Sequence, residues 1–352
     1  MGPWDAVEAG LYPAESAGVL AASSPGLRIA DHRAVHLVTR GNVDGIVSAA
    51  LFFSRHPEGR VSFVPSATSA VDTLRKDLST RLFYVVDLGL TPELIRSMNM
   101  KGKTGQGIVL LDHHQQSELY ASELGPHVRA EVGAGGSAAS FVLRHFGIED
   151  PALQRLAALA DIVEYGTTPF LDRAVSEWGF DRLEEEAVHL DFAWRLQIDD
   201  DRFRAMSARR LSRGVWPSEV GEIRRRYLQM LNENRWIKAK ERVRSHLDVR
   251  NGVALLHFGK RKPSLLGFGT RALTSVAKEE GCDLAVLVNR RKELASVALR
   301  ALADEPRINL GLFVEDFTRR HGIVGGGHPT SAGAKIWGRH LPVFLNRVYG
   351  YG

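Results

Sequence analysis

The stretch GIVLLDHH, from Gly107 to His114, carries the clearest fold signal in the sequence. Its first six residues predict a buried parallel strand, because strands covered on both faces are apolar without alternation. The run LFYVVD, from Leu82 to Asp87, has the same form and also ends on an aspartate. Ligands of open α/β sheets bind beyond the carboxyl ends of the strands. Both acids are therefore expected at one edge of a parallel sheet, where a functional site forms.

The sequence around these strands alternates apolar runs with helical segments, which is typical of a parallel sheet covered by helices. In the first half we expect two further strands, Ala34–Thr39 and Val61–Val64, and three helices, Val43–Arg55, Ser137–Phe146 and Leu153–Val163. After residue 252 we expect strands Val253–Phe258, Asp283–Asn289 and Glu293–Arg300 with helices Thr270–Glu280 and Asn309–His321.

These patterns predict an α/β protein with more than one domain, since 352 residues exceed what one compact core usually serves. Residues 1–166 are expected to form a doubly wound parallel-sheet domain. Residues 167–250 are expected to form a helical connector, because this stretch is charged and lacks a strand pattern. Residues 251–352 are expected to form a smaller C-terminal α/β domain.

Composition and charge are those of a globular protein with two unlike halves. Hydrophobic residues make up 44% of the chain, and no apolar run is long enough to span a bilayer. Cys282 is the only cysteine, which excludes an internal disulfide and fits a reducing compartment. Met1 to Leu27 lack the features of a secretory signal, so we expect a cytoplasmic protein. Residues 1–170 hold 14 basic and 18 acidic side chains, a net −4, and residues 171–352 hold 32 and 23, a net +9 that favours polyanions.

Acids and histidines recur where the predicted strands end and in one apolar helix. The set comprises Asp44, Ser48, Asp87, Asp112, His113, His114 and Asp161. Carboxylate and imidazole are ligands for Mn²⁺, Fe²⁺ or Zn²⁺, so a sheet that brings these residues together predicts a metal site. Taken singly, each acid is equally explained as a helix cap or a buried hydrogen-bond acceptor.

A second group lies near the C-terminus, in the run GGGHPTSAG that begins at Gly325. Gly325, Gly326 and Gly327 let backbone N–H groups approach an anion, and His328 can donate to a phosphate oxygen. Arg300, at the end of a predicted strand, can pair bidentately with phosphate. Alone, the run is equally typical of a flexible glycine turn.

Taken together, these residues resemble the DHH phosphoesterases. Asp44-Gly45 with Ser48, then Asp87, the triplet Asp112–His114 and Asp161 match the four DHH motifs in order. The GGGH run with Arg300 resembles the accompanying DHHA1 domain. The resemblance covers residues 34–166 and 252–345 and implies a doubly wound domain, a helical linker and a substrate-binding domain around a cleft with two Mn²⁺ ions.

The first motif departs from this family pattern. The strip TRGNVDG, residues 39–45, keeps the last aspartate as Asp44 but has Asn42 where the family has another and Arg40 two positions earlier. The family's histidine is also missing. The resemblance implies that Asp44, Asp87, His113 and Asp161 hold one metal, whereas the other keeps only Asp87. An amide is a poorer ligand for a hard cation than a carboxylate.

Three interpretations follow. In the first, one Mn²⁺ is favoured over two, with Mg²⁺ as an alternative, while Arg40, Asp112 and His114 act as catalytic residues. In the second, the protein is catalytically inactive and binds a nucleotide or single strand as a scaffold. In the third, His36, Asp31 or His32 completes the first metal site in a shifted register.

For the enzyme, we expect hydrolysis of phosphodiester bonds in short oligonucleotides, dinucleotides or related phosphate esters. Arg300, His328 and the glycines Gly325–Gly327 are expected to bind the substrate. Relatives that act on long strands usually add a further domain, for which this length leaves no room. The arginine-rich connector leaves contact with a longer strand open, and a homodimer is also left open. We expect no membrane contact.

Overall fold

The computed structural model describes residues 35–164, 166–258, 265, 267–291, 293–303, 307–323 and 325–350. Its contacts divide the chain into two units. The first runs through His113 and includes Tyr120–Asp191 and Asp200–Arg224. The second holds His114–Leu119, Phe192–Asp199 and the chain from Arg225 onward. The N-terminal segment, with Asp31 and His32, lies outside the described residues, and the boundaries at 166 and 250 stay a prediction.

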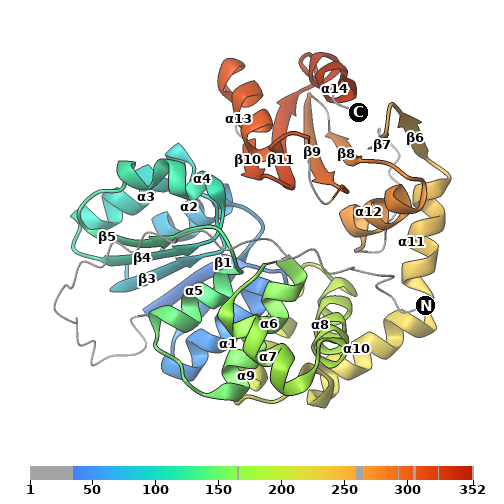
Figure 1. The fold of residues 1–352 in the computed structure, drawn as a ribbon. Coiled ribbons are helices and arrows are strands. Elements are labelled where there is room, and N and C mark those ends of the chain that lie inside the picture. The colour runs from blue at the N-terminus through green and yellow to red at the C-terminus, as the bar shows by residue number, and fades with distance from the viewer. Residues whose placement is uncertain are drawn as a thin grey trace. The chain divides into compact units, whose positions relative to one another are not determined.

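A five-stranded parallel sheet forms the first unit (Figure 1). Its strands are β1 (Val35–Arg40), β2 (Arg60–Val64), β3 (Leu82–Val86), β4 (Gly107–Asp112) and β5 (Val128–Val132). They are ordered β2-β1-β3-β4-β5, and every neighbouring pair is parallel. The chain moves outward in opposite directions from β1 and β3, so these strands flank the topological switch point, where open α/β sheets bind ligands.

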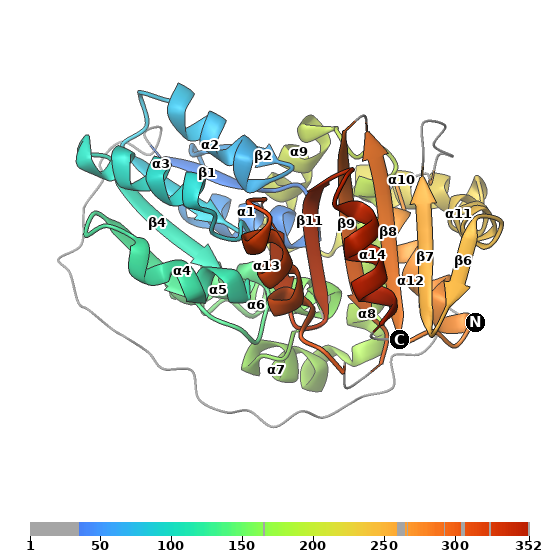
Figure 2. The ribbon, with the colours of Figure 1, turned by 90° about the horizontal axis from the view of Figure 1, so that it is seen from above.

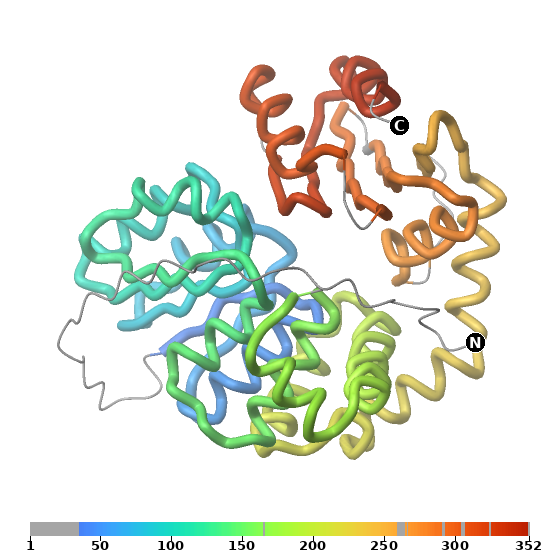
Figure 3. The backbone as a smooth tube through the Cα atoms, viewed as in Figure 1, coloured from blue at the N-terminus to red at the C-terminus, as the bar shows by residue number. Residues whose placement is uncertain are grey.

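Helices cover both faces of this sheet, as the tube in Figure 3 makes clear. The helices α5 (Ala138–His145), α6 (Pro151–Glu164) and α9 (Asp201–Leu211) pack around α1 (Val43–Arg55) on one face. On the other face lie α2 (Ala67–Lys76) and α3 (Pro92–Lys103). The residues from Val43 to Phe53 are all buried, as expected for an apolar helix between a sheet and other helices. The predicted doubly wound α/β fold is thereby confirmed.

The predicted helical stretch between the two sheets is confirmed as well. It contains α7 (Pro169–Trp178), α8 (Phe180–Arg195), α9, α10 (Gly221–Asn232) and α11 (Arg235–Arg244). A short helix, α4 (Gln115–Tyr120), follows β4. Within the described part of the chain, none of the helices combines the length and apolar character needed to cross a bilayer.

The second unit is built on a six-stranded mixed sheet (Figure 2). Its strands are β6 (Leu247–Arg250), β7 (Val253–Phe258), β8 (Leu284–Arg291), β9 (Leu294–Ala301), β10 (Gly325–His328) and β11 (Ser331–Trp337). Their order is β10-β11-β9-β8-β7-β6, with β7 and β8 parallel and the other pairs antiparallel. The helices are α12 (Gly269–Glu279), α13 (Leu310–Arg320) and α14 (Leu341–Tyr349).

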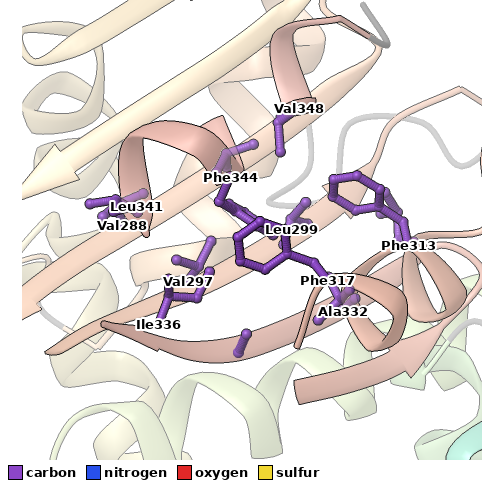
Figure 4. Packing of buried hydrophobic residues seen from close by; sticks show 14 of the residues in the cluster. Val288, Val297, Leu299, Phe313, Phe317, Ala332, Ile336, Leu341, Phe344 and Val348 are labelled. Carbon is purple, nitrogen blue, oxygen red and sulfur yellow. The ribbon is translucent and has the colours of Figure 1, made fainter. Parts of the chain in front are cut away.

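An apolar core holds α13 and α14 against this sheet (Figure 4). Phe317 of α13 and Phe344 of α14 are fully buried and meet edge to face, with ring centroids 5.0 Å apart. They pack over Val297 and Leu299 of β9. This apolar cluster holds β9, which carries the predicted substrate-binding residue Arg300, and β11, which pairs with β10, the strand of the other predicted residues, Gly325–Gly327 and His328.

Candidate metal centre

Three acids of the first unit lie where neighbouring parallel strands end. Asp44 is in the first turn of α1, just after β1, whereas Asp87 directly follows β3 and Asp112 ends β4. All three are buried, with exposed fractions of 0%, 1% and 0%. Because β1, β3 and β4 are adjacent, their carboxyl ends share one edge of the sheet. The site therefore forms at the switch point, as the strand pattern predicts.

His113 joins two of these acids. Its Nε2 lies 3.4 Å from Asp87 Oδ1 and 3.7 Å from Asp44 Oδ2, and its Nδ1 lies 2.7 Å from the carbonyl oxygen of Gly136. A carbonyl can only accept, so Nδ1 carries a proton and Nε2 faces the carboxylates. Burial lowers the pKa of His113, but the hydrogen bond to Asp87 and the charges of Asp44 and Asp87 outweigh it and raise this pKa to about 10.

The Asp44 carboxylate is held by the start of α5. Its two oxygens accept the backbone N–H groups of Ala138, at 2.8 Å, and Ala139, at 2.7 Å. The positive end of a helix dipole also stabilises a carboxylate here. Burial and the negative charge of Asp87 nevertheless raise the pKa of Asp44 well above its usual value. Two buried carboxylates side by side call for a cation between them.

The backbone around these acids leaves little freedom. A Cβ on Gly45 would lie 1.8 Å from the carbonyl oxygen of Arg40, so only glycine fits after Asp44. Asp87 has φ 56°, a left-handed conformation that costs a non-glycine residue of order 1–3 kcal/mol. Arg204 of α9 donates to the carbonyl oxygen of Gly41 at 2.9 Å and holds the loop between β1 and α1.

The first-motif strip places a positive charge and an amide beside the acids. The Arg40 side chain is exposed. Loss of hydration lowers the pKa of Arg40, but the negative charges of Asp87, Glu164 and Asp44 outweigh this effect and raise the pKa overall. Asn42 caps α1, since its Oδ1 accepts the Gly45 N–H at 2.9 Å. The Asn42 amide also donates to Glu164 Oε1 at 3.3 Å.

Glu164 is not among the candidate site residues predicted from the sequence. Its spacing from Asp161 is the feature of the sequence that could have indicated it, because residues three apart on a helix share a face. Both belong to α6.

Asp161 is buried in a hydrogen-bond network. It accepts from the backbone N–H and the hydroxyl of Ser137 at 2.7 and 2.6 Å, and from the Ser140 and Thr168 hydroxyls at 2.8 and 2.5 Å. Burial raises the pKa of Asp161 while these donors lower it, and the net shift is upward. Its ligand atoms do not join the tight group of Asp44, Asp87 and His113. By holding Ser137, Asp161 also holds the adjacent Gly136 carbonyl that orients His113, and its role as a ligand stays a prediction.

The residues at this edge fit a divalent cation. One ligand atom each from Asp44, Asp87 and His113 lies within 4.8 Å of the others. The fixed Nδ1 proton of His113 leaves Nε2 facing inward, as for histidines that bind metals. Two carboxylates and one imidazole form a mixed oxygen and nitrogen set that suits Mn²⁺ or Fe²⁺ and accepts Mg²⁺. His36, one alternative ligand, instead contacts Asp77 and Ser62, each at 2.8 Å.

In the second unit, the predicted substrate residues lie on adjacent strands. His328 of β10 pairs with Ser331 of β11, which pairs with Arg300 of β9. Directly opposed residues share one face of a sheet, so Arg300, Ser331 and His328 form a cross-strand row. His114, which the contacts assign to this unit, stacks on His328 with ring centroids 4.7 Å apart.

Packing also explains two of the three glycines in β10. A Cβ on Gly325 would lie 2.7 Å from the Ala334 side chain, and one on Gly327 would lie 2.2 Å from the Ser331 carbonyl oxygen. Gly327 has φ 156°. The close hairpin between β10 and β11 therefore requires glycine at both positions, independently of any anion.

Neither the family models nor the curated proteins include a match to this chain. Solved structures do match, each over 90% of it. One is the DHH domain of a protein described as belonging to a family of ribosomal proteins, with 17% identity, a TM-score of 0.63 and 87% of that chain covered. A pGpG-specific phosphodiesterase from Vibrio cholerae has 14% identity, a TM-score of 0.50 and 98% covered. An exopolyphosphatase-related protein from Bacteroides fragilis has 12% identity, a TM-score of 0.51 and 91% covered. The chain thus has the phosphoesterase-like fold of DHH-domain proteins, as predicted.

Proposed function

We propose that this chain, which has the DHH fold, is a metal-dependent phosphoesterase that hydrolyses phosphodiester bonds. The observation that carries the proposal is the buried group of Asp44, Asp87 and His113 at the switch point of the sheet. Buried carboxylates are costly unless a cation or hydrogen bonds compensate them. We propose that Asp44, Asp87 and His113 hold a single Mn²⁺ or Mg²⁺, with Asp161 as a further ligand.

A bound divalent cation supplies Lewis-acid activation of water and of a phosphoryl oxygen. The chain's own residues then have three tasks in the reaction. The first task is to hold two carboxylates in position. Two backbone N–H groups fix Asp44, and a left-handed backbone conformation fixes Asp87. The Arg40 guanidinium neutralises negative charge that develops on the phosphoryl oxygens, and preorganised cations of this kind lower the barrier to phosphoryl transfer. We propose that Asp112 and His114 also act in catalysis, as the family resemblance implies.

The substrate proposed is a short oligonucleotide, a dinucleotide or a related phosphate ester. The row of Arg300, Ser331 and His328 supports this, because a guanidinium, a hydroxyl and an imidazole on one sheet face all donate to phosphate oxygens. The pGpG-specific phosphodiesterase shows that one protein of similar fold acts on a linear dinucleotide. We also propose a cytoplasmic location, and a homodimer stays open.

Arg40 and Asn42 favour a second candidate, a catalytically inactive protein that binds a nucleotide or single strand as a scaffold. Asn42 serves as the helix cap of α1, a task that needs no metal. The acids around Arg40 raise its pKa, so a permanent positive charge already offsets part of their charge. In a scaffold, Arg40 would take the place of the cation.

Metal content and turnover separate the two candidates. We expect the purified protein to bind Mn²⁺ by elemental analysis and to cleave a chromogenic phosphodiester and short RNA. Asp87→Asn is expected to lower turnover by about two orders of magnitude or more, because it removes a charged ligand shared by the whole group. Asp172→Asn, at an exposed position of α7, is the matched control and keeps full activity. A protein without bound metal and without turnover would support the scaffold instead.

A further inference from the structure

Asn42 replaces one acid of the first motif, and a glutamate far along the chain contacts it. The amide of Asn42 donates to Glu164 Oε1 at 3.3 Å, across a separation of 122 residues. The Asn42 oxygen is already committed to the Gly45 N–H at 2.9 Å, as the cap of α1. Two contacts therefore orient the Asn42 side chain, and its oxygen faces the Gly45 N–H rather than the proposed cation.

The end of α6 is pinned to the loop that orients His113. Gly166 follows Glu164 by two residues, and a Cβ on Gly166 would lie 2.7 Å from the Cα of Gly136. The carbonyl oxygen of Gly136 is the acceptor that fixes His113 Nδ1. The same loop is held from Asp161 through Ser137. Glu164 therefore extends from backbone that is anchored at the site itself.

Through its contact with Asn42, Glu164 adds a third carboxylate near the centre. Glu164 is half-buried, so water screens its charge only in part. A third carboxylate beside two buried ones is unfavourable unless a further cation offsets it.

We infer that Glu164 takes the place of the acid that Asn42 replaces in the first motif and acts as an additional ligand of the divalent cation. This inference rests on the proposed function, since it needs a metal at Asp44, Asp87 and His113. A carboxylate is a stronger ligand for a hard cation than the amide of Asn42. Glu164 contacts Asn42 from α6. Its oxygens, like those of Asp161, lie outside the tight group of Asp44, Asp87 and His113, so ligation requires the Glu164 side chain to turn toward the cation.

The inference can be tested by removing the carboxylate at position 164 and restoring one at position 42. Glu164→Gln keeps an oxygen that accepts from Asn42 but removes the charge. The double variant Asn42→Asp with Glu164→Gln returns a carboxylate to the first motif, and aspartate remains a good helix cap. Glu149→Gln, at an exposed loop position, is the matched control. Calorimetric titration with MnCl₂ measures affinity and stoichiometry, and thermal unfolding without metal checks that each variant folds.

We expect Glu164→Gln to weaken Mn²⁺ binding about tenfold or more, and the double variant to recover most of the loss. The control is expected to bind as the unaltered protein does. Unchanged Mn²⁺ affinity in Glu164→Gln, beside lost binding in Asp87→Asn, would overturn the inference and leave the proposed function standing. A loss that the double variant does not recover would also overturn it, because Glu164 would not then replace the missing acid. An unaltered protein that binds no Mn²⁺ would instead refute the proposed metal site.

Discussion

The orientation of one side chain, His113, decides the chemical character of this site. Its Nδ1 proton is committed to the Gly136 carbonyl, so the ring cannot exchange the roles of its nitrogens. Nε2 then faces Asp44 and Asp87. The hydrogen bond to Asp87 and the charges of Asp44 and Asp87 outweigh burial and favour the protonated ring. Because metals bind the neutral ring, a cation bound at the proposed site would displace this proton.

Asp161 offers a prediction at the same scale. Asp161→Asn is expected to lower the free energy of unfolding without metal by about 1–3 kcal/mol, the range for a broken buried hydrogen-bond network. The reason is that an amide has one acceptor oxygen, whereas both carboxylate oxygens now accept from Ser137, Ser140 and Thr168. Denaturant unfolding of the metal-free protein measures the change.

The control for Asp161→Asn is Asp172→Asn, an exposed aspartate whose removal is expected to leave stability within about 0.5 kcal/mol. Unaltered metal-free stability in Asp161→Asn would contradict the predicted structural role of this network. Greatly weakened Mn²⁺ binding in the same variant would still support the ligand role proposed above for Asp161.

At the scale of elements, the sequence predicts best where burial is uniform. The helix Val43–Arg55 and the strand Gly107–Asp112 begin and end where their apolar patterns indicate. The sequence does not predict the helices α2 and α3 or the strand β5. In β5 no residue is fully buried, so its alternation of apolar and polar residues is weak. In α2 and α3 only part of the residues are buried, so their apolar residues form no continuous run.

The site was predictable only in part, for a related reason. Asp44, Asp87 and Asp112 could be predicted because they lie at or just after the ends of predicted parallel strands, and those ends share one edge of the sheet. The contact between Asn42 and Glu164 depends on where α6 ends relative to a loop more than a hundred residues earlier. The hydrogen-bond donors around Asp161 likewise come together only through tertiary packing, so no local sequence pattern predicts them.

Asp77 ties four elements together and yields a prediction of pH dependence. Lying at the end of α2, it accepts from His36 of β1, at 2.8 Å, and from Arg60 of β2, at 2.6 Å. Its backbone oxygen accepts from Lys101 of α3 at 2.7 Å. Burial opposes ionisation, but donors led by the Thr80 hydroxyl and His36 hold the pKa of Asp77 well below its usual range.

A depressed folded-state pKa contributes stability that is present above the unfolded-state value, about 3.9, and is lost as the pH falls through and below it. We therefore expect Asp77→Asn to be less stable than the unaltered protein at pH 7. The difference should shrink steadily between about pH 5 and pH 2. Denaturant unfolding at several pH values provides the measurement. A difference that stays constant across this range would show that Asp77 acts through packing rather than through its charge.

Across the whole molecule, the two units have separate hydrophobic cores. In the first, α2 and α3 pack on the parallel sheet around residues such as Phe83 and Leu94, and the acids lie at the end of that sheet. In the second, α13 and α14 pack on the mixed sheet around Phe317 and Phe344. The net charge is −4 over residues 1–170 and +9 over residues 171–352. This distribution of charge fits the proposed binding of a cation in the acidic part and of a phosphate-containing substrate in the basic part.

Separate cores predict that a metal stabilises the two units unequally. At a hundred times its dissociation constant, Mn²⁺ adds about 2.7 kcal/mol to a unit that binds it only when folded. For a unit of this size, that shifts the unfolding temperature by roughly 5–10 °C. Differential scanning calorimetry with MnCl₂ should therefore show one transition that moves upward and another that stays. Excess EDTA should reverse the shift, and Asp87→Asn should abolish it. Equal shifts of both transitions would indicate that the units unfold together, and no shift of either transition would contradict the proposed metal site.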